Sequence, residues 1–291
     1  MILAHKLPLK FLLRSARRDM LFVSIFTIIA LIAHYFVEFP SIPIAISALL
    51  GTAISLILSF RLAQSYDRWW EARTIWGAVV NDSRSLVLQL LNYSKSSDRS
   101  KVETMAKRHI VWVDAVALML RERPLENMGK QYISDEEYQT YKQAFHAPLL
   151  ITQEQIASLN ALDLNSYEKM QIDSTFVRLV SSMGQAERIK NTVFPSEYQR
   201  YLHLSIYLFL GFISISLANL GHHWEIVLLM LIAAPFFLLE KAAEHLQDPF
   251  ENRPTDVPIS AISRNIEINI LTLLQEKEIP KPLEPEDYYI D

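Results

Sequence analysis

Apolar runs and polar stretches alternate along this chain, and four of the apolar runs are candidates to cross a membrane. The runs cover residues 20–37, 42–62, 202–220 and 224–239. A single charge, Arg61, interrupts the second run, and about 20 apolar residues in a helix are enough to cross a bilayer. Because the runs come as two well-separated pairs, the pattern predicts two transmembrane hairpins.

The long stretch between the two pairs predicts helices that lie in water. From residue 77 to about residue 195 no run is long and apolar enough to span a membrane. Residues 80–91 and 105–120 show helical periodicity. Helix starts are indicated at 152–155 and 165–168, where a capping residue is followed by an acid or an amide. We therefore expect a helical domain of roughly 120 residues.

These patterns predict an all-α protein in five parts. The first part is a basic, amphipathic segment at 1–19, which is expected to lie on the membrane surface. The other parts are a first transmembrane hairpin at 20–64, a cytoplasmic helical domain at 65–200, a second transmembrane hairpin at 201–240, and a cytoplasmic C-terminal helix with a polar tail at 241–291.

The distribution of Lys and Arg predicts the orientation. Basic residues precede the first run and follow the second, whereas the turns at 38–43 and 219–223 contain none. Cytoplasmic segments carry the excess of Lys and Arg. We therefore expect a multi-pass protein of the cell (inner) membrane with both termini in the cytoplasm.

A charged, aromatic segment follows the second run. We call it the collar, and it consists of Asp67, Arg68, Trp69, Trp70 and Glu71. Trp is typical of a membrane–water boundary. Arg68 and Glu71 are spaced for an ion pair along one helix, while Asp67 and Glu71 repel, so a partner for Asp67 is expected on another segment. We favour a structural collar that locks one subunit to the next over a collar that sets the ion field of a pore.

Two stripes run along the second apolar run at a spacing of four residues. The first contains small residues, which let helices approach closely in lipid: Ser47, Gly51, Ser55 and Ser59. The second, about 100° round the helix, contains Ala48, Thr52, Leu56 and Phe60. The second stripe either faces lipid or a protein core, or it lines a narrow apolar passage that controls wetting.

Three segments carry a resemblance to a known family. Residues 51–77, in which Phe60 lies eight residues before Arg68, resemble the second transmembrane helix of bestrophins, in particular the bacterial members. The segment 187–195, which reads ERIKNTVFP, and the segment 243–250, which reads AEHLQDPF, are similar to the same family.

The resemblance implies a homopentamer in which five copies of the second helix surround a central pore. Thr52, Leu56 and Phe60 then form the pore neck, where Thr52 is smaller and more polar than the bulky apolar residue usual in the family. A cytoplasmic aperture is implied on the helix before residue 187, with Met170 as the nearest match and Tyr167 or Ile172 as alternatives. The acidic run that binds calcium in animal members is interrupted at 253–255, so no calcium site is expected.

Composition argues against several other classes. The 291 residues include no Cys and only 6 Gly, which excludes a thiolate nucleophile and argues against a glycine-rich phosphate loop. The 8 histidines form no H-E-x-x-H motif and no paired Glu-x-x-His motif. A net charge of −4 argues against nucleic-acid binding. We expect neither an enzyme nor a bound metal or cofactor.

The predicted function is passive conduction of small monovalent inorganic ions through a homopentamer in the lipid bilayer. Glu38 at the outer mouth and the net charge of −4 favour a cation such as sodium over chloride, because rings of acids concentrate cations. The alternatives are a chloride channel of the same architecture, a secondary transporter and a membrane scaffold. A transporter would need charges near the midplane or broken helices in matching halves, and the predicted spans contain almost none.

Overall fold

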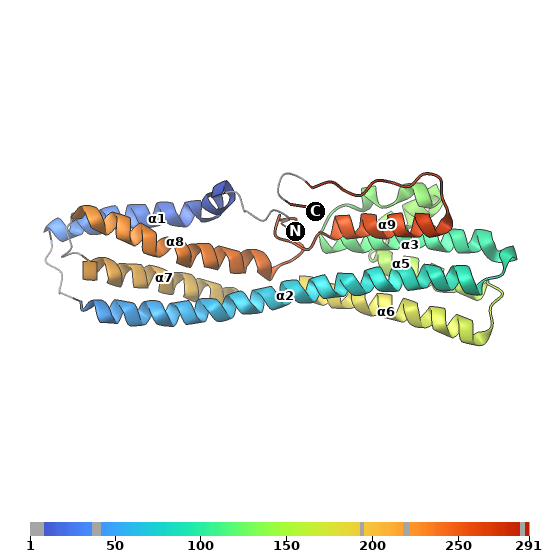
Figure 1. Ribbon diagram of the computed structural model, residues 1–291, viewed down its shortest axis with the longest axis horizontal. Helices are drawn as coiled ribbons and strands as arrows, with labels where there is room; N and C mark the ends of the chain where they lie inside the picture. The colour runs from blue at the N-terminus through green and yellow to red at the C-terminus, as the bar shows by residue number, and fades with distance from the viewer. Residues whose placement is uncertain (1–8, 37–41, 193–194, 218–221, 286–288, 291) are drawn as a thin grey trace. The chain divides into compact units, whose positions relative to one another are not determined.

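The computed structural model describes residues 9–36, 42–192, 195–217, 222–285 and 289–290, and its regular elements there are helices (Figure 1). The α-helices are α1 (Leu9–Phe36), α2 (Ile44–Tyr93), α3 (Arg99–Leu120), α4 (Asp135–Gln143), α5 (Ala147–Asn160), α6 (Ser166–Asn191), α7 (Ser196–Leu217), α8 (His222–Gln247) and α9 (Ile259–Leu274). Short 3-10 helices lie at η1 (Ser96–Asp98), η2 (Leu125–Asn127) and η3 (Lys130–Tyr132). The predicted all-α fold class is confirmed over these residues.

The chain divides into two units, and helix α2 contributes residues to both. The hairpin unit contains the described part of residues 4–69 and 193–248. The central unit contains the described part of residues 70–192 and 249–291. The hairpin unit therefore contains both apolar pairs of the sequence, and the central unit contains the long polar stretch.

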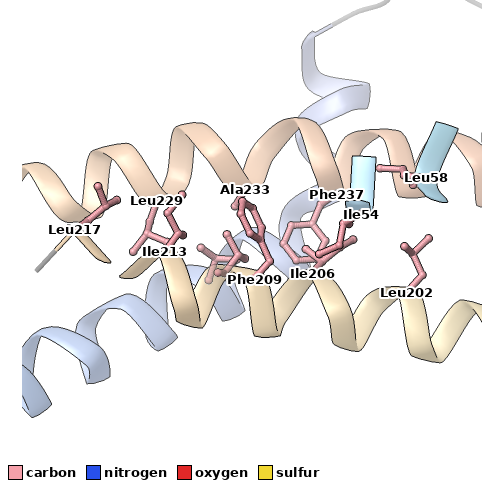
Figure 2. Packing of buried hydrophobic residues seen from close by; sticks show 12 residues of the cluster. Ile54, Leu58, Leu202, Ile206, Phe209, Ile213, Leu217, Leu229, Ala233 and Phe237 are labelled. Carbon is pink, nitrogen blue, oxygen red and sulfur yellow. The ribbon is translucent and has the colours of Figure 1, made fainter. Parts of the chain in front are cut away.

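The core of the hairpin unit is an apolar seam between four helices. Helix α1 packs along α8, and α7 packs against α8. Figure 2 shows Ile54 and Leu58 of α2 among Ile206 and Phe209 of α7 and Phe237 of α8. The seam leaves the outer faces of the four helices for contacts outside the chain.

Those outer faces carry large exposed apolar side chains: Leu21, Ile29, Leu49, Leu208 and Leu231. Large apolar side chains exposed on all four helices are typical of contact with a membrane or with another protein. Over the described residues, two helices are long and apolar enough to cross a membrane by length and composition, namely α2 and the Glu197–Leu217 part of α7. The four-span topology and its boundaries remain predictions.

Helix α2 continues for 50 residues, from the second apolar run through the collar to Tyr93. After Pro43 this segment contains no proline, so no residue removes a backbone donor or clashes with the preceding turn. The helical periodicity at 80–91 therefore belongs to α2 itself. One continuous helix carries both the apolar run and the collar.

Helix α3 forms the core of the central unit and packs against α5, α6 and α9. Its buried side chains point to several sides of the helix and include Met105, His109, Ile110, Trp112 and Val116. A helix that buries residues nearly all round lies inside a bundle.

Helix starts in the central unit follow local capping chemistry. The predicted start at 165–168 is confirmed, because the Asn165 and Glu168 side chains each accept the other's backbone N–H in a capping box. The predicted start at 152–155 is wrong, since α5 begins at Ala147 with His146 as its N-cap. The Thr152 hydroxyl donates 2.8 Å to the Pro148 carbonyl inside that helix and is not a cap.

His109 is a fully buried polar group in this core. Its Nε2 lies 2.8 Å from the Ser83 hydroxyl, and its ring stacks on Trp112 at a centroid distance of 5.4 Å. Burial lowers the pKa of His109 from 6.5 to about 3, because the charged imidazolium loses its hydration. The folded chain therefore holds this imidazole neutral.

We predict that His109 makes folding sensitive to acid. Below pH 6.5 the His109 imidazole binds a proton in the unfolded chain but stays neutral in the folded chain. The free energy of unfolding therefore decreases as the pH falls from 6.5 toward about 3. Relative to His109→Gln, the wild-type protein should lose about 2 kcal/mol of unfolding free energy between pH 7 and pH 5. Denaturant titrations at both pH values measure this difference, and parallel pH profiles for the two proteins would contradict the assignment.

Candidate functional site: the exposed face of helix α2

Within the hairpin unit, helix α2 buries one stripe of side chains against its own chain. The stripe consists of Ser47, Gly51, Ile54, Leu58, Arg61 and Ser65. The Ser47 hydroxyl lies 2.9 Å from that of Ser216 on α7. A Cβ added to Gly51 would lie 2.9 Å from the Phe209 ring, so any larger residue would require that ring to shift.

The opposite face of α2 is exposed and contains the three predicted neck residues. Leu56 is 58% exposed and Phe60 is 61% exposed, and Thr52 is exposed as well. At about 100° per residue, Leu56 lies about 180° round the helix from the centre of the buried stripe. The Thr52 hydroxyl donates 2.9 Å to the Ala48 carbonyl, which satisfies its donor within the helix. This row is thus available to solvent, lipid or other copies of the chain.

The stripe of small residues behaves as predicted for only part of its length. Ser47 and Gly51 pack against α7, whereas Ser55 and Ser59 are exposed. The Ser55 and Ser59 hydroxyls each donate 2.8 Å to a carbonyl four residues earlier in α2. Because a step of four residues turns about 40° past one full turn, the stripe rotates away from α7. Close packing on another helix of the chain is therefore found for Ser47 and Gly51. For Ser55 and Ser59, packing on other helices stays a prediction.

The collar charges contact other helices. Arg68 Nε donates 2.8 Å to the Gln247 carbonyl at the end of α8. Glu71 forms an ion pair of 2.5 Å with Arg188 of α6. Asp67 is exposed and has no hydrogen-bond or ion-pair partner among the residues that the structure describes. The partner expected for Asp67 on another segment is therefore not found in that part of the chain.

The collar aromatics differ in exposure. Tyr66 and Trp69 stack with their ring centroids 6.2 Å apart. Trp70 is 55% exposed, which leaves a large amphipathic ring at the surface. Such a ring suits a boundary between apolar and wet surroundings.

A cluster of ionisable side chains lies inside the hairpin unit, one from each of its four helices. Arg61 of α2 and Glu240 of α8 approach to 3.6 Å, with side chains 1% and 7% exposed. His203 of α7 lies 2.9 Å from Glu240 and 3.7 Å from Asp19 of α1. The sequence signalled only Arg61, because the other three become neighbours through folding.

The residues considered for the aperture divide by burial. Met170 is 64% exposed and Tyr167 is 80% exposed, whereas Ile172 is 0% exposed in the central core. Ile172 is therefore excluded as a lumen-facing side chain. Val177, two turns after Met170 on α6, is 61% exposed and becomes a further candidate. The sequence did not suggest it, because exposure of a single Val has no signature there.

Two further predictions concern the outer mouth and the absence of a calcium site. Glu38, the predicted outer mouth, lies outside the described residues. In the segment where the sequence predicts no calcium site, Asp256 Oδ2 accepts the Arg253 N–H at 3.0 Å, and Glu251 pairs with Lys190 at 3.0 Å. Over the described chain, no group of three or more His, Asp or Glu is placed to hold a metal ion.

Comparison with known proteins identifies the family. The model of bacterial and fungal bestrophin proteins matches residues 12–272. The chain belongs to the bestrophin family. The voltage-dependent anion channel-forming protein YneE of Escherichia coli K12 is 30% identical over 261 residues, covering 88% of this chain and 84% of YneE. The voltage-dependent anion channel-forming protein alr2987 of Nostoc is 27% identical, and the matched region covers 78% of this chain and 76% of alr2987.

A solved structure shares the bestrophin fold. The bacterial bestrophin homologue of Klebsiella pneumoniae superposes with a TM-score of 0.82 at 24% identity, covering 89% of this chain and 98% of that chain. The family resemblance seen in the sequence and the predicted helical architecture are thereby confirmed. Membership also confirms that the chain is not an enzyme, because bestrophins are channels.

We predict that Arg61→Met destabilises the hairpin unit. The substitution leaves Glu240 buried without its guanidinium partner, which costs about 3–5 kcal/mol. Denaturant titration in mixed micelles measures the loss. The Arg61→Met, Glu240→Leu double variant should regain most of it, because neither charge is then left alone. Arg84→Met, at an exposed position of α2, is the matched control and should change stability by less than about 0.5 kcal/mol. Equal losses of stability for Arg61→Met and Arg84→Met would contradict the assignment of a buried ion pair between Arg61 and Glu240.

Proposed function

We propose that five copies of this chain assemble in a lipid bilayer into a channel that conducts small monovalent inorganic ions passively. The observation that carries the proposal is the exposed row of Thr52, Leu56 and Phe60, opposite the stripe that α2 buries. Five such rows around an axis enclose a passage. The names of YneE and alr2987, which describe channel-forming proteins, support the same function.

In this assembly the row forms a hydrophobic neck. Rings of Leu56 and Phe60 offer no hydrogen bonds to water, so small changes in width control whether the neck is wet. Thr52 forms the ring on the other side of Leu56, where its smaller side chain leaves more room. Its hydroxyl is already bonded to α2, which reduces its attraction for ions.

A second constriction lies on α6 of the central unit. We assign it to Met170, which is 64% exposed, with Val177 as the exposed apolar neighbour two turns later. Four collar residues hold the subunits together around the neck, and they are Arg68, Trp69, Trp70 and Glu71. The two Trp rings lie at the membrane boundary, whereas Asp67 faces the passage. Four spans, at 20–37, 42–62, 202–220 and 224–239, place both termini in the cytoplasm of an inner-membrane protein.

A cation such as sodium is favoured over chloride. Asp67 lies eleven residues after Leu56, three turns further along α2 and within about 20° of the same face. Its carboxylate is exposed and has no partner among the described residues. Five such carboxylates concentrate cations at one end of the neck, as does Glu38 if it lines the other end.

The names of the relatives favour the alternative ion. YneE and alr2987 are named for forming voltage-dependent anion channels, which makes chloride the second candidate for the permeating ion. The two candidates share the neck and differ only in the sign of the ion. A secondary transporter would show flux that saturates with substrate concentration, and a scaffold would show no ion flux from an intact assembly.

We predict that Phe60→Ala raises ion flux from liposomes severalfold. Removing the ring widens and wets the neck, which lowers the barrier to ions. Leu231→Ala truncates an equally exposed apolar side chain on α8 and should leave the flux unchanged. Unchanged conductance for Phe60→Ala would show that this residue does not line the passage.

We predict that Asp67→Asn weakens cation selectivity. Under a sodium chloride gradient, the wild-type reversal potential should lie toward the sodium equilibrium potential, and that of Asp67→Asn closer to zero, because the ring of carboxylates is lost. Glu136→Gln removes one exposed charge per subunit from α4 and serves as control. A wild-type reversal potential toward the chloride equilibrium value would refute the cation assignment and support the anion channel.

A further inference from the structure

A polar pocket opens on the hairpin unit where three helices meet. Its volume is about 420 Å³, within the range of sites for small ligands. The ionisable side chains that line it come from α2, α7 and α8, and they are Arg61, Arg200, His203, Glu240, Lys241 and Glu244. Leu204 and Tyr207 of α7 line one side of the same pocket.

A second, apolar pocket continues from the first. Its volume is about 370 Å³, and it lies between Phe26 of α1 and the α7 residues Leu208, Gly211 and Ile215. Leu204 and Tyr207 line both pockets, so the two are adjacent along α7, and we treat them as the two ends of one groove. The groove is polar at one end and apolar at the other, which is the chemical pattern of an amphipathic molecule.

The polar end has an excess of positive charge. Arg61, Arg200 and Lys241 line the pocket together with two carboxylates, so the lining has a formal balance of +1 with His203 neutral. Asp19 of α1, 3.7 Å from His203, lies outside this lining. The carboxylates are already engaged, since Glu240 lies 2.9 Å from His203 and Glu244 lies 2.7 Å from Lys241. Arg200 is exposed and has no hydrogen-bond or ion-pair partner among the described residues. An anion with several acceptor oxygens would complement this end.

The two ends match the depth profile of a bilayer leaflet. Arg61 lies at the end of the second apolar run, and Arg200 lies in the first two turns of α7. From Leu204 to Ile215 the groove follows α7 for about 16 Å, past the middle of the helix and toward its C-terminal end. A headgroup at the polar end therefore places an acyl chain along the apolar end.

We infer that this groove is a binding site for an anionic phospholipid, with its phosphate beside Arg200 and an acyl chain over Gly211. Gly211 leaves bare backbone on the groove floor, since a Cβ there would meet only the Phe26 ring, at 3.7 Å. A second copy of the chain would cover the apolar end but would bring no phosphate to the cationic end, so charge complementarity favours the lipid. The inference rests on a membrane location and not on ion conduction.

Native mass spectrometry of the purified full-length protein tests the site. The protein is incubated with phosphatidylglycerol or with phosphatidylcholine of equal chain length, and retained lipid is counted per subunit. Phosphatidylglycerol should be retained in preference. Arg200→Gln should lower that retention about fivefold, equivalent to about 1 kcal/mol for one basic side chain at an anionic lipid. Arg84→Gln removes the same charge from an exposed site in the central unit and should change nothing.

A second variant tests the apolar end. Gly211→Leu fills the groove floor and should lower retention of both lipids, while Gly211→Ala, which adds only a van der Waals contact, should retain them. If Gly211→Leu fails to fold, the comparison of Arg200→Gln with Arg84→Gln still tests the lipid site. Arg200 is exposed, so its substitution should not disturb folding.

Four results would overturn the inference. The first two are equal retention of the two lipids, and equal effects of Arg200→Gln and Arg84→Gln on phosphatidylglycerol retention. The third is that inorganic phosphate displaces bound lipid as effectively as added lipid does. The fourth is a change in subunit number with Gly211→Leu while lipid retention stays unchanged. The last result would identify the groove as a contact between copies. A protein that retains phosphatidylglycerol but conducts no ions would leave the inference standing and refute only the proposed channel.

Discussion

Helix α2 can bury only one stripe of its surface against its own chain, and this constraint organises the hairpin unit. The close approach of α7 at Gly51, where a Cβ would lie 2.9 Å from Phe209, fixes which side of α2 faces inward. The side about 180° away then carries Leu56 and Phe60 into the surroundings. An exposed apolar row on a helix long and apolar enough to cross a membrane has three possible neighbours there, namely lipid, another protein or a passage. The proposed assembly uses the last of these.

The buried charges constrain the same unit from inside. Arg61, Glu240, His203 and Asp19 come from four different helices, so any movement of one helix changes the surroundings of charges on the others. Charges in an apolar interior are expensive unless they are paired. The pairing therefore links the position of α2, and with it the exposed row, to α1, α7 and α8.

Periodicity and run length sufficed for the all-α class, and the motif at 51–77 sufficed for the family. Local chemistry located the α6 start at Asn165 but not the α5 start, because a buried Thr152 and a capping Thr look alike in a sequence. The charge cluster could not be predicted, since Asp19 and His203 lie far apart in the chain. The sequence also could not tell that Met170 and Val177 are exposed while Ile172 is buried. Which face of α6 is buried depends on its packing against α3 and α5, and periodicity alone does not show it.

A three-dimensional map of the purified assembly by electron microscopy tests the central claim most directly. The account predicts five subunits around one axis, with the side chains of Thr52, Leu56 and Phe60 facing an open passage along that axis. A lone subunit, or an assembly in which those three side chains face lipid, would contradict it.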